Sequence, residues 1–202
     1  MVMANYNGSG EPGDGMYRYQ LVALPKAELK GALAEELRMF SHSYHGDRET
    51  DPEPCVVVSE FMAREEMEET IIRYLQRITG EQESFDITFN NYSGTPMHTV
   101  YIRILDHRPF QALAAQLQPI DGYVRSNDCP PVKFMLQPNI PISKKLSGRA
   151  YEQAIAEYAR RDFHGSFEVT ELMLVRDGTG YGNSIRRAVL RLQPARTGLS
   201  SN

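Results

Sequence analysis

Histidine side chains are the groups best suited to move protons near neutral pH, and two of them stand close together in this chain. His42 and His45 are three residues apart, and the acids Asp47, Glu49 and Asp51 follow. The group could be a metal site or an acid–base pair. Two histidines without a third ligand at a defined spacing favour a solvated polar loop instead, so we predict no metal site. The remaining histidines are assigned to a turn or to the ends of helices: His98, His107 and His164.

Cys55 follows this group in the sequence and has a side chain that could act as a nucleophile. A thiolate at this position could attack a substrate or carry a proton, but no neighbour in sequence obviously lowers its pKa. The alternative is a small buried side chain. With Cys129 as the second cysteine, the chain fits a reduced cytoplasmic protein better than a disulfide scaffold.

A short basic segment, Lys144, Lys145 and Arg149, could hold a phosphate where a strand passes into a helix. The hydroxyls of Ser59 and Ser143 could add donors. The alternative is a solvated connection between two elements.

Composition narrows the class of protein. Lys and Arg total 22 against 26 Asp and Glu, so the net charge of −4 predicts no global basic field for nucleic acid. No apolar run approaches the length of a membrane span, and the first residues lack the basic-then-apolar pattern of a signal peptide. We expect a cytoplasmic protein with no cofactor and no membrane partner.

Hydrophobic periodicity predicts the elements of the first half. We expect a strand over 17–24, a helix over 29–40, a buried strand over 55–59 and a helix over 67–78 that Gly80 ends at its C′ position. Strands over 85–92 and 99–105 follow, joined by a turn at 93–96, and then a helix after Pro109.

The second half repeats this order. A strand over 134–142 and a helix over 150–158 precede a hairpin of 167–175 with 185–192, which turns at 178–180. Three segments match in order, 54–59 with 138–143, 84–88 with 166–170, and 100–104 with 188–192, at offsets of 84, 82 and 88 residues. We therefore predict a duplicated unit.

These observations predict an α+β fold of two lobes related by a pseudo-twofold axis, with two antiparallel sheets flanked by helices around a central cleft. Residues 1–16 are predicted to be a flexible leader, 17–193 a single bilobal domain and 194–202 a flexible tail.

The segments 17–25, 54–59, 138–143 and 167–176 give the chain a resemblance to the 2H phosphoesterases, which include LigT-like 2′-5′ RNA ligases and 2′,3′-cyclic phosphodiesterases. The resemblance covers about residues 17–193. It implies two His-x-Thr/Ser motifs, one in each lobe, whose side chains point into the cleft. One imidazole removes a proton and the other donates one, while the hydroxyls hold the phosphate.

The chain departs from this pattern at all four motif positions. The first motif falls on Cys55 and Val57, and the second on Asn139 and Pro141. Asn139 cannot exchange a proton near neutral pH, and neither Val57 nor Pro141 has a hydroxyl. The resemblance therefore implies no catalytic residues of the family type.

Three hypotheses remain open. The first is a protein without catalysis that binds a nucleotide, an RNA end or another phosphorylated ligand in the cleft. Its candidate ligand-binding residues are Cys55, Ser59, Asn139, Ser143, Lys144 and Lys145. The second is an active cyclic phosphodiesterase or RNA-end-processing enzyme with substituted residues, such as Cys55 with His42 or His45. The third is a scaffold for protein interactions, and the oligomeric state is left open.

Overall fold

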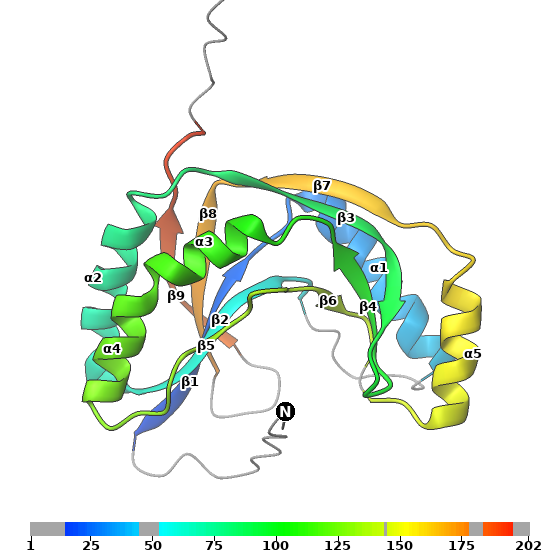
Figure 1. Ribbon diagram of the computed structural model, residues 1–202, viewed down its shortest axis with the longest axis horizontal. Coiled ribbons are helices and arrows are strands. Elements are labelled where there is room, and N and C mark those ends of the chain that lie inside the picture. Colours follow the sequence, from blue (N-terminus) through cyan, green and yellow to red (C-terminus); the bar gives the residue numbers. More distant parts are fainter. Residues whose placement is uncertain (1–14, 45–52, 144, 178–183, 196–202) are drawn as a thin grey trace, which may run out of the picture.

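The described part of this computed structural model, residues 15–44, 53–143, 145–177 and 184–195, forms two antiparallel sheets with helices packed on one face of each. The elements follow in this order: β1 (Met16–Ala23), α1 (Ala27–Tyr44), β2 (Val56–Arg64), the 3-10 turn η1 (Glu65–Met67), α2 (Glu68–Thr79), β3 (Phe85–Gly94), β4 (Val100–Ile104), α3 (Arg108–Gln116), α4 (Gln118–Ser126), β5 (Lys133–Phe134), β6 (Ile140–Pro141), α5 (Gly148–Tyr158), β7 (His164–Val169), β8 (Glu171–Asp177) and β9 (Ser184–Arg191). The predicted α+β class with two antiparallel sheets is confirmed (Figure 1).

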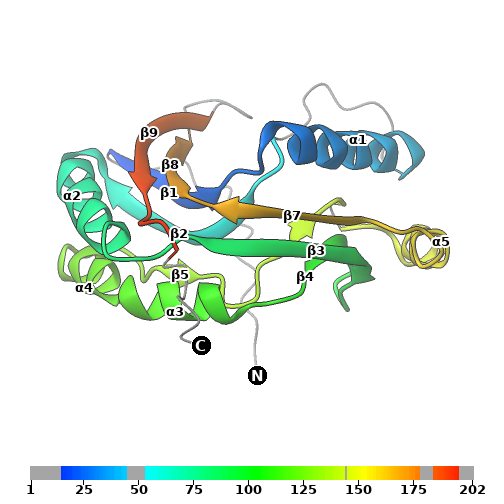
Figure 2. The same cartoon turned by 90° about the horizontal axis from the view of Figure 1, so that it is seen from above.

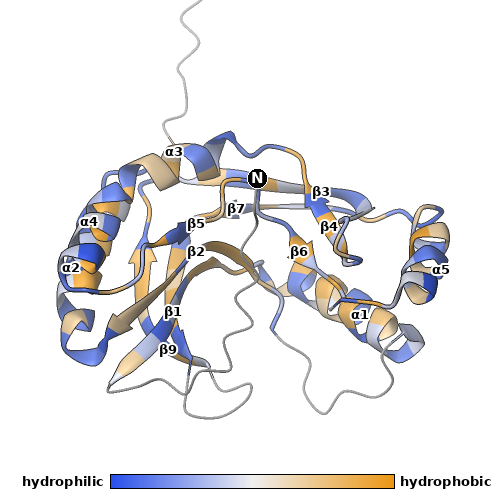
Figure 3. Ribbon diagram, turned by 60° about the horizontal axis from the view of Figure 1, so that its bottom comes forward, coloured by the Kyte–Doolittle hydropathy of each residue, from blue (hydrophilic) through white to orange (hydrophobic). Residues whose placement is uncertain are grey.

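The five-stranded sheet has the order β5-β2-β1-β8-β9. Alternation along β1 buries Tyr19 and Leu21 on the face that α2 and α4 cover, and it turns Arg18 and Gln20 to the opposite face. We call this opposite, helix-free side the open face of the five-stranded sheet. Figure 3 shows hydrophobic residues concentrated along β1 and β2.

The four-stranded sheet has the order β6-β4-β3-β7, and α1 and α5 pack against it. Phe89 and Ile102 are buried toward these helices. The two helices contact each other through Phe40 of α1 and Tyr158 of α5, whose ring centroids are 5.0 Å apart. Thr88 and the other exposed residues of these strands occupy the opposite side, the open face of the four-stranded sheet. In Figure 2, α2 and α4 lie at one end of the molecule and α1 and α5 toward the other.

The pairing of β3 with β7 supports the predicted duplication. These strands contain most of the matched segments 84–88 and 166–170, and Asp86 pairs with its own counterpart, Glu168. Phe85 pairs with Val169 and Ile87 with Phe167, so the register is symmetric about that pair. A local pseudo-twofold axis therefore passes between Asp86 and Glu168. The third predicted match, of 100–104 with 188–192, is not supported. The first segment is β4, an internal strand of its sheet, whereas the second lies in and just after β9, an edge strand, so the two do not occupy equivalent positions.

Two predicted continuous strands are wrong in the same way. The strand expected over 134–142 is two separate pairs of residues, β5 in the five-stranded sheet and β6 in the four-stranded one. The strand expected over 167–175 divides at Thr170 into β7 and β8, which also belong to different sheets. In each case an apolar pattern continues while the chain crosses between sheets. The helix α4 had no counterpart in our prediction.

Smaller corrections concern the ends of elements. Gly80 is the C-cap of α2 with φ −65°, so it does not take the left-handed conformation expected at C′. The turn between β3 and β4 comes later than predicted, because β3 continues through Gly94. Met16, assigned to the leader, is the first residue of β1, and Ala195, assigned to the tail, donates a backbone hydrogen bond to the Ser84 hydroxyl. The rest of the predicted leader and tail, apart from Gly15 and Pro194, and the turn at 178–180 lie outside the described residues.

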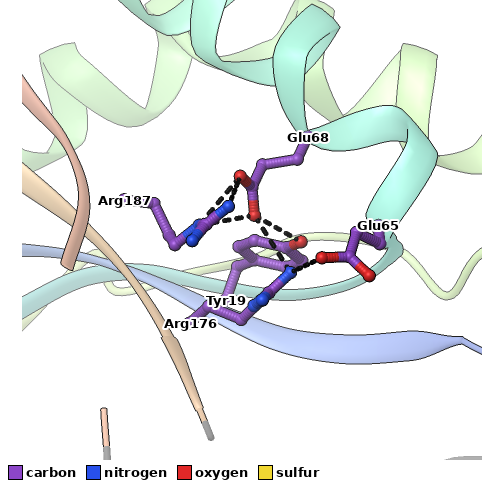
Figure 4. A network of polar contacts seen from close by, with 5 residues as sticks. All are labelled: Tyr19, Glu65, Glu68, Arg176 and Arg187. Atoms are coloured by element: carbon purple, nitrogen blue, oxygen red, sulfur yellow. Dashed lines mark hydrogen bonds and ion pairs between the residues drawn. The ribbon is translucent and has the colours of Figure 1, made fainter. Parts of the chain in front are cut away.

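A buried ionic network holds the covered face of the five-stranded sheet to α2 (Figure 4). The Glu68 carboxylate accepts hydrogen bonds from the Tyr19 hydroxyl at 3.0 Å, from Arg187 Nε at 2.8 Å and from Arg176 Nη1 at 3.4 Å. Arg176 also donates to Glu65 at 2.8 Å. Burial raises the pKa of Tyr19 to about 12, so its hydroxyl stays a donor at physiological pH. The network therefore connects β1, β8 and β9 to the start of α2.

Among the helices of the described residues, none has the length and apolar character that crossing a membrane would require.

Candidate functional site

The first motif position lies where β2 begins. Cys55 is half-buried directly before the strand, and Val57 is half-buried within it and pairs with Val22. Val56 and Val58 are buried on the covered side, so alternation puts Cys55 and Val57 on the open face of the five-stranded sheet.

The second motif position lies where β6 begins, in the other sheet. Asn139 is half-buried before the strand and Pro141 is exposed within it. Ile140 is buried and pairs with Ile102, which puts Asn139 and Pro141 on the open face of the four-stranded sheet. In Figures 1 and 3 the beginning of β2 lies next to β6. The two motif segments thus come from different sheets and lie near each other in the middle of the molecule.

The sheet register also gives a second correspondence between the motifs. Leu21 in β1 pairs with Leu174, and Ile102 in β4 pairs with Tyr92. Tyr92 and Leu174 are 82 positions apart, which is the offset between the matched segments 84–88 and 166–170. Leu21 and Ile102 therefore occupy equivalent positions in the two sheets. Their other partners are Ser59 in β2 and Ile140 in β6. Because β2 has a bulge at this point, the open-face residue before Ser59 is Val57, which then corresponds to Asn139. Neither correspondence places a histidine at either motif.

The environment of Cys55 disfavours a thiolate. Burial raises the pKa of Cys55 to about 11, and the nearby Glu53 carboxylate adds to the shift. Glu53 itself is paired with Lys30 and Arg186, with Arg186 Nη2 at 3.1 Å. The hydrogen bond from Lys30 is the main reason that the pKa of Glu53 is lowered despite partial burial. Cys55 therefore carries its proton at neutral pH.

The other predicted ligand-binding residues have mixed positions. Ser143 is buried, and its hydroxyl accepts a hydrogen bond from the Val100 backbone N–H at 2.7 Å, which ties the segment after β6 to β4. Ser59 is buried within β2 opposite Leu21. Lys145 is exposed before α5, and Lys144 lies outside the described residues.

Of the two neighbouring histidines, only His42 is among the described residues. His42 lies in the last turn of α1 rather than in a loop, and His45 with the following acids lies outside the described residues. Within the described ranges, no three His, Cys, Asp or Glu side chains gather as a metal site would need.

The two open faces differ in their charges. On the five-stranded sheet, Arg18 donates to Glu60 at 2.6 Å and to Asp177 at 3.3 Å, and Gln20 donates to Glu60 at 3.0 Å. Burial alone would raise the pKa of Glu60, but the bonds from Arg18 and Gln20 outweigh it and lower that pKa. Arg18 on this face is thus engaged by carboxylates.

On the four-stranded sheet, Arg103 is exposed and its Nε donates to the Asn90 carbonyl oxygen at 3.1 Å. The register of β4 with β6, carried one residue further, sets Asn139 opposite Arg103. In the described part of the chain, no carboxylate lies within salt-bridge distance of Arg103.

A pocket of about 370 Å³ continues this open face, and sequence reasoning missed it. Its lining comes from β3, β7 and the residue after β4: Thr88, Phe89, Asn90, Leu105, His164, Gly165 and Ser166. His164 was expected to end a helix, but it is the first residue of β7, six residues after α5 ends. The Phe163-His164-Gly165 sequence gave no signal of this position, because the cross-strand neighbours that form the pocket lie far away in sequence.

Comparison with known proteins gives similarity at the level of structure. No protein-family model matches the sequence, and no curated protein sequence matches it. Escherichia coli LigT in complex with phosphate is 14% identical, with a TM-score of 0.60 over 89% of this chain and 99% of that one. The same protein with 3′-AMP is 16% identical, with a TM-score of 0.58 over 89% and 99% of the two chains. TT0787 of Thermus thermophilus is 16% identical, with a TM-score of 0.62 over 88% and 99%. With two antiparallel sheets and their flanking helices, this chain therefore has the fold of the LigT-like 2H phosphoesterases.

Proposed function

We propose that this protein has lost phosphodiesterase and RNA ligase catalysis and binds a nucleotide, an RNA end or another phosphorylated ligand between its two sheets. The observation that carries the proposal is the state of the two motif positions. Cys55 and Asn139 directly precede β2 and β6 on the open faces, where the resemblance implies proton carriers. The Cys55 thiol keeps its proton near neutral pH, so it is no general base, and the Asn139 amide has no proton to exchange there. Loss of one positioned acid or base costs about 10²–10⁴ in rate, and both are missing here.

Ligand binding is supported by the chemistry that remains. Arg103 and Asn139 offer a cation and an amide on the same open face, a combination suited to phosphate oxygens. Structures of E. coli LigT are known with phosphate, 3′-AMP, NADP⁺ and ATP, so the fold accommodates phosphorylated molecules in a distant relative.

The test has a binding arm and a turnover arm. We expect 3′-AMP or a short RNA with a 3′-phosphate to bind in calorimetry, and no turnover of 2′,3′-cyclic AMP when the reaction is followed by ³¹P NMR. Asn139→Asp keeps the side chain's shape but adds a negative charge, so it should weaken 3′-AMP binding about tenfold or more. Gln111→Glu adds the same charge on the exposed side of α3 and should leave binding unchanged.

Two results would contradict the proposal. Turnover that Cys55→Ala abolishes would establish the substituted enzyme instead. Absence of binding by both 3′-AMP and the RNA would leave the open faces without a phosphorylated ligand and favour the scaffold hypothesis.

A further inference from the structure

The pocket on the open face of the four-stranded sheet has a defined chemical lining. Its polar side chains come from two cross-strand pairs of β3 and β7, Thr88 with Ser166 and Asn90 with His164. Directly paired residues have Cβ atoms about 5 Å apart, so each pair presents two hydrogen-bonding groups side by side. Leu105, which is 55% exposed, adds an apolar wall. Hydroxyls and an amide can both donate and accept, which suits a ligand with several hydroxyl groups.

The charges at the two ends of this pocket have opposite sign. At the end formed by Asn90, the side chain of Arg103 extends from β4 toward β3, and its Nε donates to the Asn90 carbonyl oxygen. At the other end, the next cross-strand pair beyond Thr88 and Ser166 is Asp86 with Glu168. Successive residues on one face of a strand are about 7 Å apart. A ligand that spans the pocket thus meets a cation at one end and two carboxylates at the other.

The opposite charges at the two ends of the pocket determine which chemical group of a ligand each end can accept. A phosphate group fits beside Arg103 and His164, but close to Asp86 and Glu168 it would be repelled. Sugar hydroxyls fit the carboxylate end, because they can donate to Asp86 while Thr88 and Ser166 contact the ring oxygens and hydroxyls. The volume of about 370 Å³ lies in the range of small-ligand sites.

We propose that this pocket binds the sugar of a phosphorylated pentose, either free or as the ribose of a nucleotide. The sugar hydroxyls lie on Thr88 and Ser166, and the phosphate lies toward Arg103. This inference rests on the proposed function and adds a sugar subsite formed by β3 and β7, separate from the two motif positions. Arg103 would then contact the phosphate from the sugar subsite on one side and lie opposite Asn139 on the other.

The test is a series of NMR titrations of the full-length protein with four probes: ribose 5-phosphate, 2-deoxyribose 5-phosphate, inorganic phosphate and 3′-AMP. We expect ribose 5-phosphate to shift the backbone amides of Thr88, Asn90, His164 and Ser166. It should bind about tenfold more tightly than the deoxy sugar, because a site built to hydrogen-bond a hydroxyl discriminates against its loss. Inorganic phosphate should bind more weakly than ribose 5-phosphate and shift the amides near Arg103.

Variants separate the two ends of the pocket. The double variant Thr88→Val with Ser166→Ala should weaken ribose 5-phosphate about tenfold and leave inorganic phosphate unchanged. Arg103→Ala should weaken both probes. Ser184→Ala and Arg191→Ala remove an exposed hydroxyl and an exposed cation from β9 and serve as matched controls that should change neither affinity.

The outcomes distinguish this inference from the proposed function. If 3′-AMP binds but shifts only amides around Cys55 and Asn139, the sugar subsite is wrong and the proposed function stands. Equal affinity for the ribose and deoxyribose phosphates would also overturn the subsite. If none of the four probes shifts any amide, the sugar subsite fails, and the proposed function loses its nucleotide ligand.

Discussion

Cys55 decides between a binding protein and a substituted enzyme, and its thiol chemistry can be predicted quantitatively. With its pKa raised to about 11 from an ordinary value of 9.0, the thiolate fraction at pH 7 falls from about 10⁻² to about 10⁻⁴. Because alkylation proceeds through the thiolate, Cys55 should react with iodoacetamide on the order of 100-fold more slowly than an ordinary exposed cysteine.

The assay follows alkylation of the Cys55 peptide by mass spectrometry from pH 6 to pH 10, which separates it from Cys129. The rate should rise about tenfold per pH unit over the whole range, without a plateau. Glu53→Gln removes the carboxylate that adds to the shift, so it should speed the reaction at pH 8. Glu35→Gln changes an exposed acid of α1 and should have no effect. A plateau below pH 8 would refute the reasoning and restore Cys55 as a candidate nucleophile.

Three further predictions concern stability. Glu68→Gln leaves the buried Arg176 without its buried anionic partner and should cost about 3 kcal/mol, or on the order of 10 °C in Tm, whereas Glu65→Gln removes a 58%-exposed partner of the same arginine and should cost less than about 1 kcal/mol. Equal losses in thermal unfolding would contradict this assignment of the network. Burial alone would raise the pKa of Glu68, but the bonds from Arg187 and Tyr19 outweigh it and lower that pKa. Its contribution is therefore complete above the unfolded value of about 4.5 and is lost as the pH falls through the lower folded pKa. Urea unfolding between pH 3 and pH 7 should show a smaller loss of stability at acid pH in Glu68→Gln than in the wild type. Gly94→Ala would place a methyl group 2.1 Å from the Tyr151 hydroxyl and 2.7 Å from a side-chain carbon of α5, so it should destabilise the protein by about 1–3 kcal/mol, while Gly31→Ala, on the exposed face of α1 with no atom within 4 Å, should not destabilise it.

The regular elements were predictable because their hydrophobic periods are local. Leu33, Leu37 and Phe40 are buried along α1 as the helical spacing requires, and the alternation of Tyr19 and Leu21 marks β1. The crossings between sheets were not predictable in this way. An apolar residue such as Phe134 is equally suited to either sheet, and only the pairing of its backbone decides which one it joins.

The candidate site likewise has one part that local sequence predicts and one part that depends on long-range strand pairing. Cys55 and Asn139 could be placed by a local sequence pattern, and the structure sets them at the starts of β2 and β6. The pocket depends on Thr88 pairing with Ser166, a contact across 78 positions of sequence. Both residues lie in the matched segments 84–88 and 166–170, but they are not at equivalent positions there, so only the antiparallel register of β3 and β7 brings the two hydroxyls together.

The placement of β3 and β8 has a consequence for assembly. Each half of the chain supplies strands to the other half's sheet: β8 and β9 complete the sheet that β1 and β2 begin, and β3 lies between β4 and β7. A fragment cut at the β3–β4 turn would therefore retain only β1 and β2 of one sheet and a single strand of the other. The halves are interlocked, so thermal unfolding should be one cooperative transition, and co-expressed fragments should reassemble only as a heterodimer.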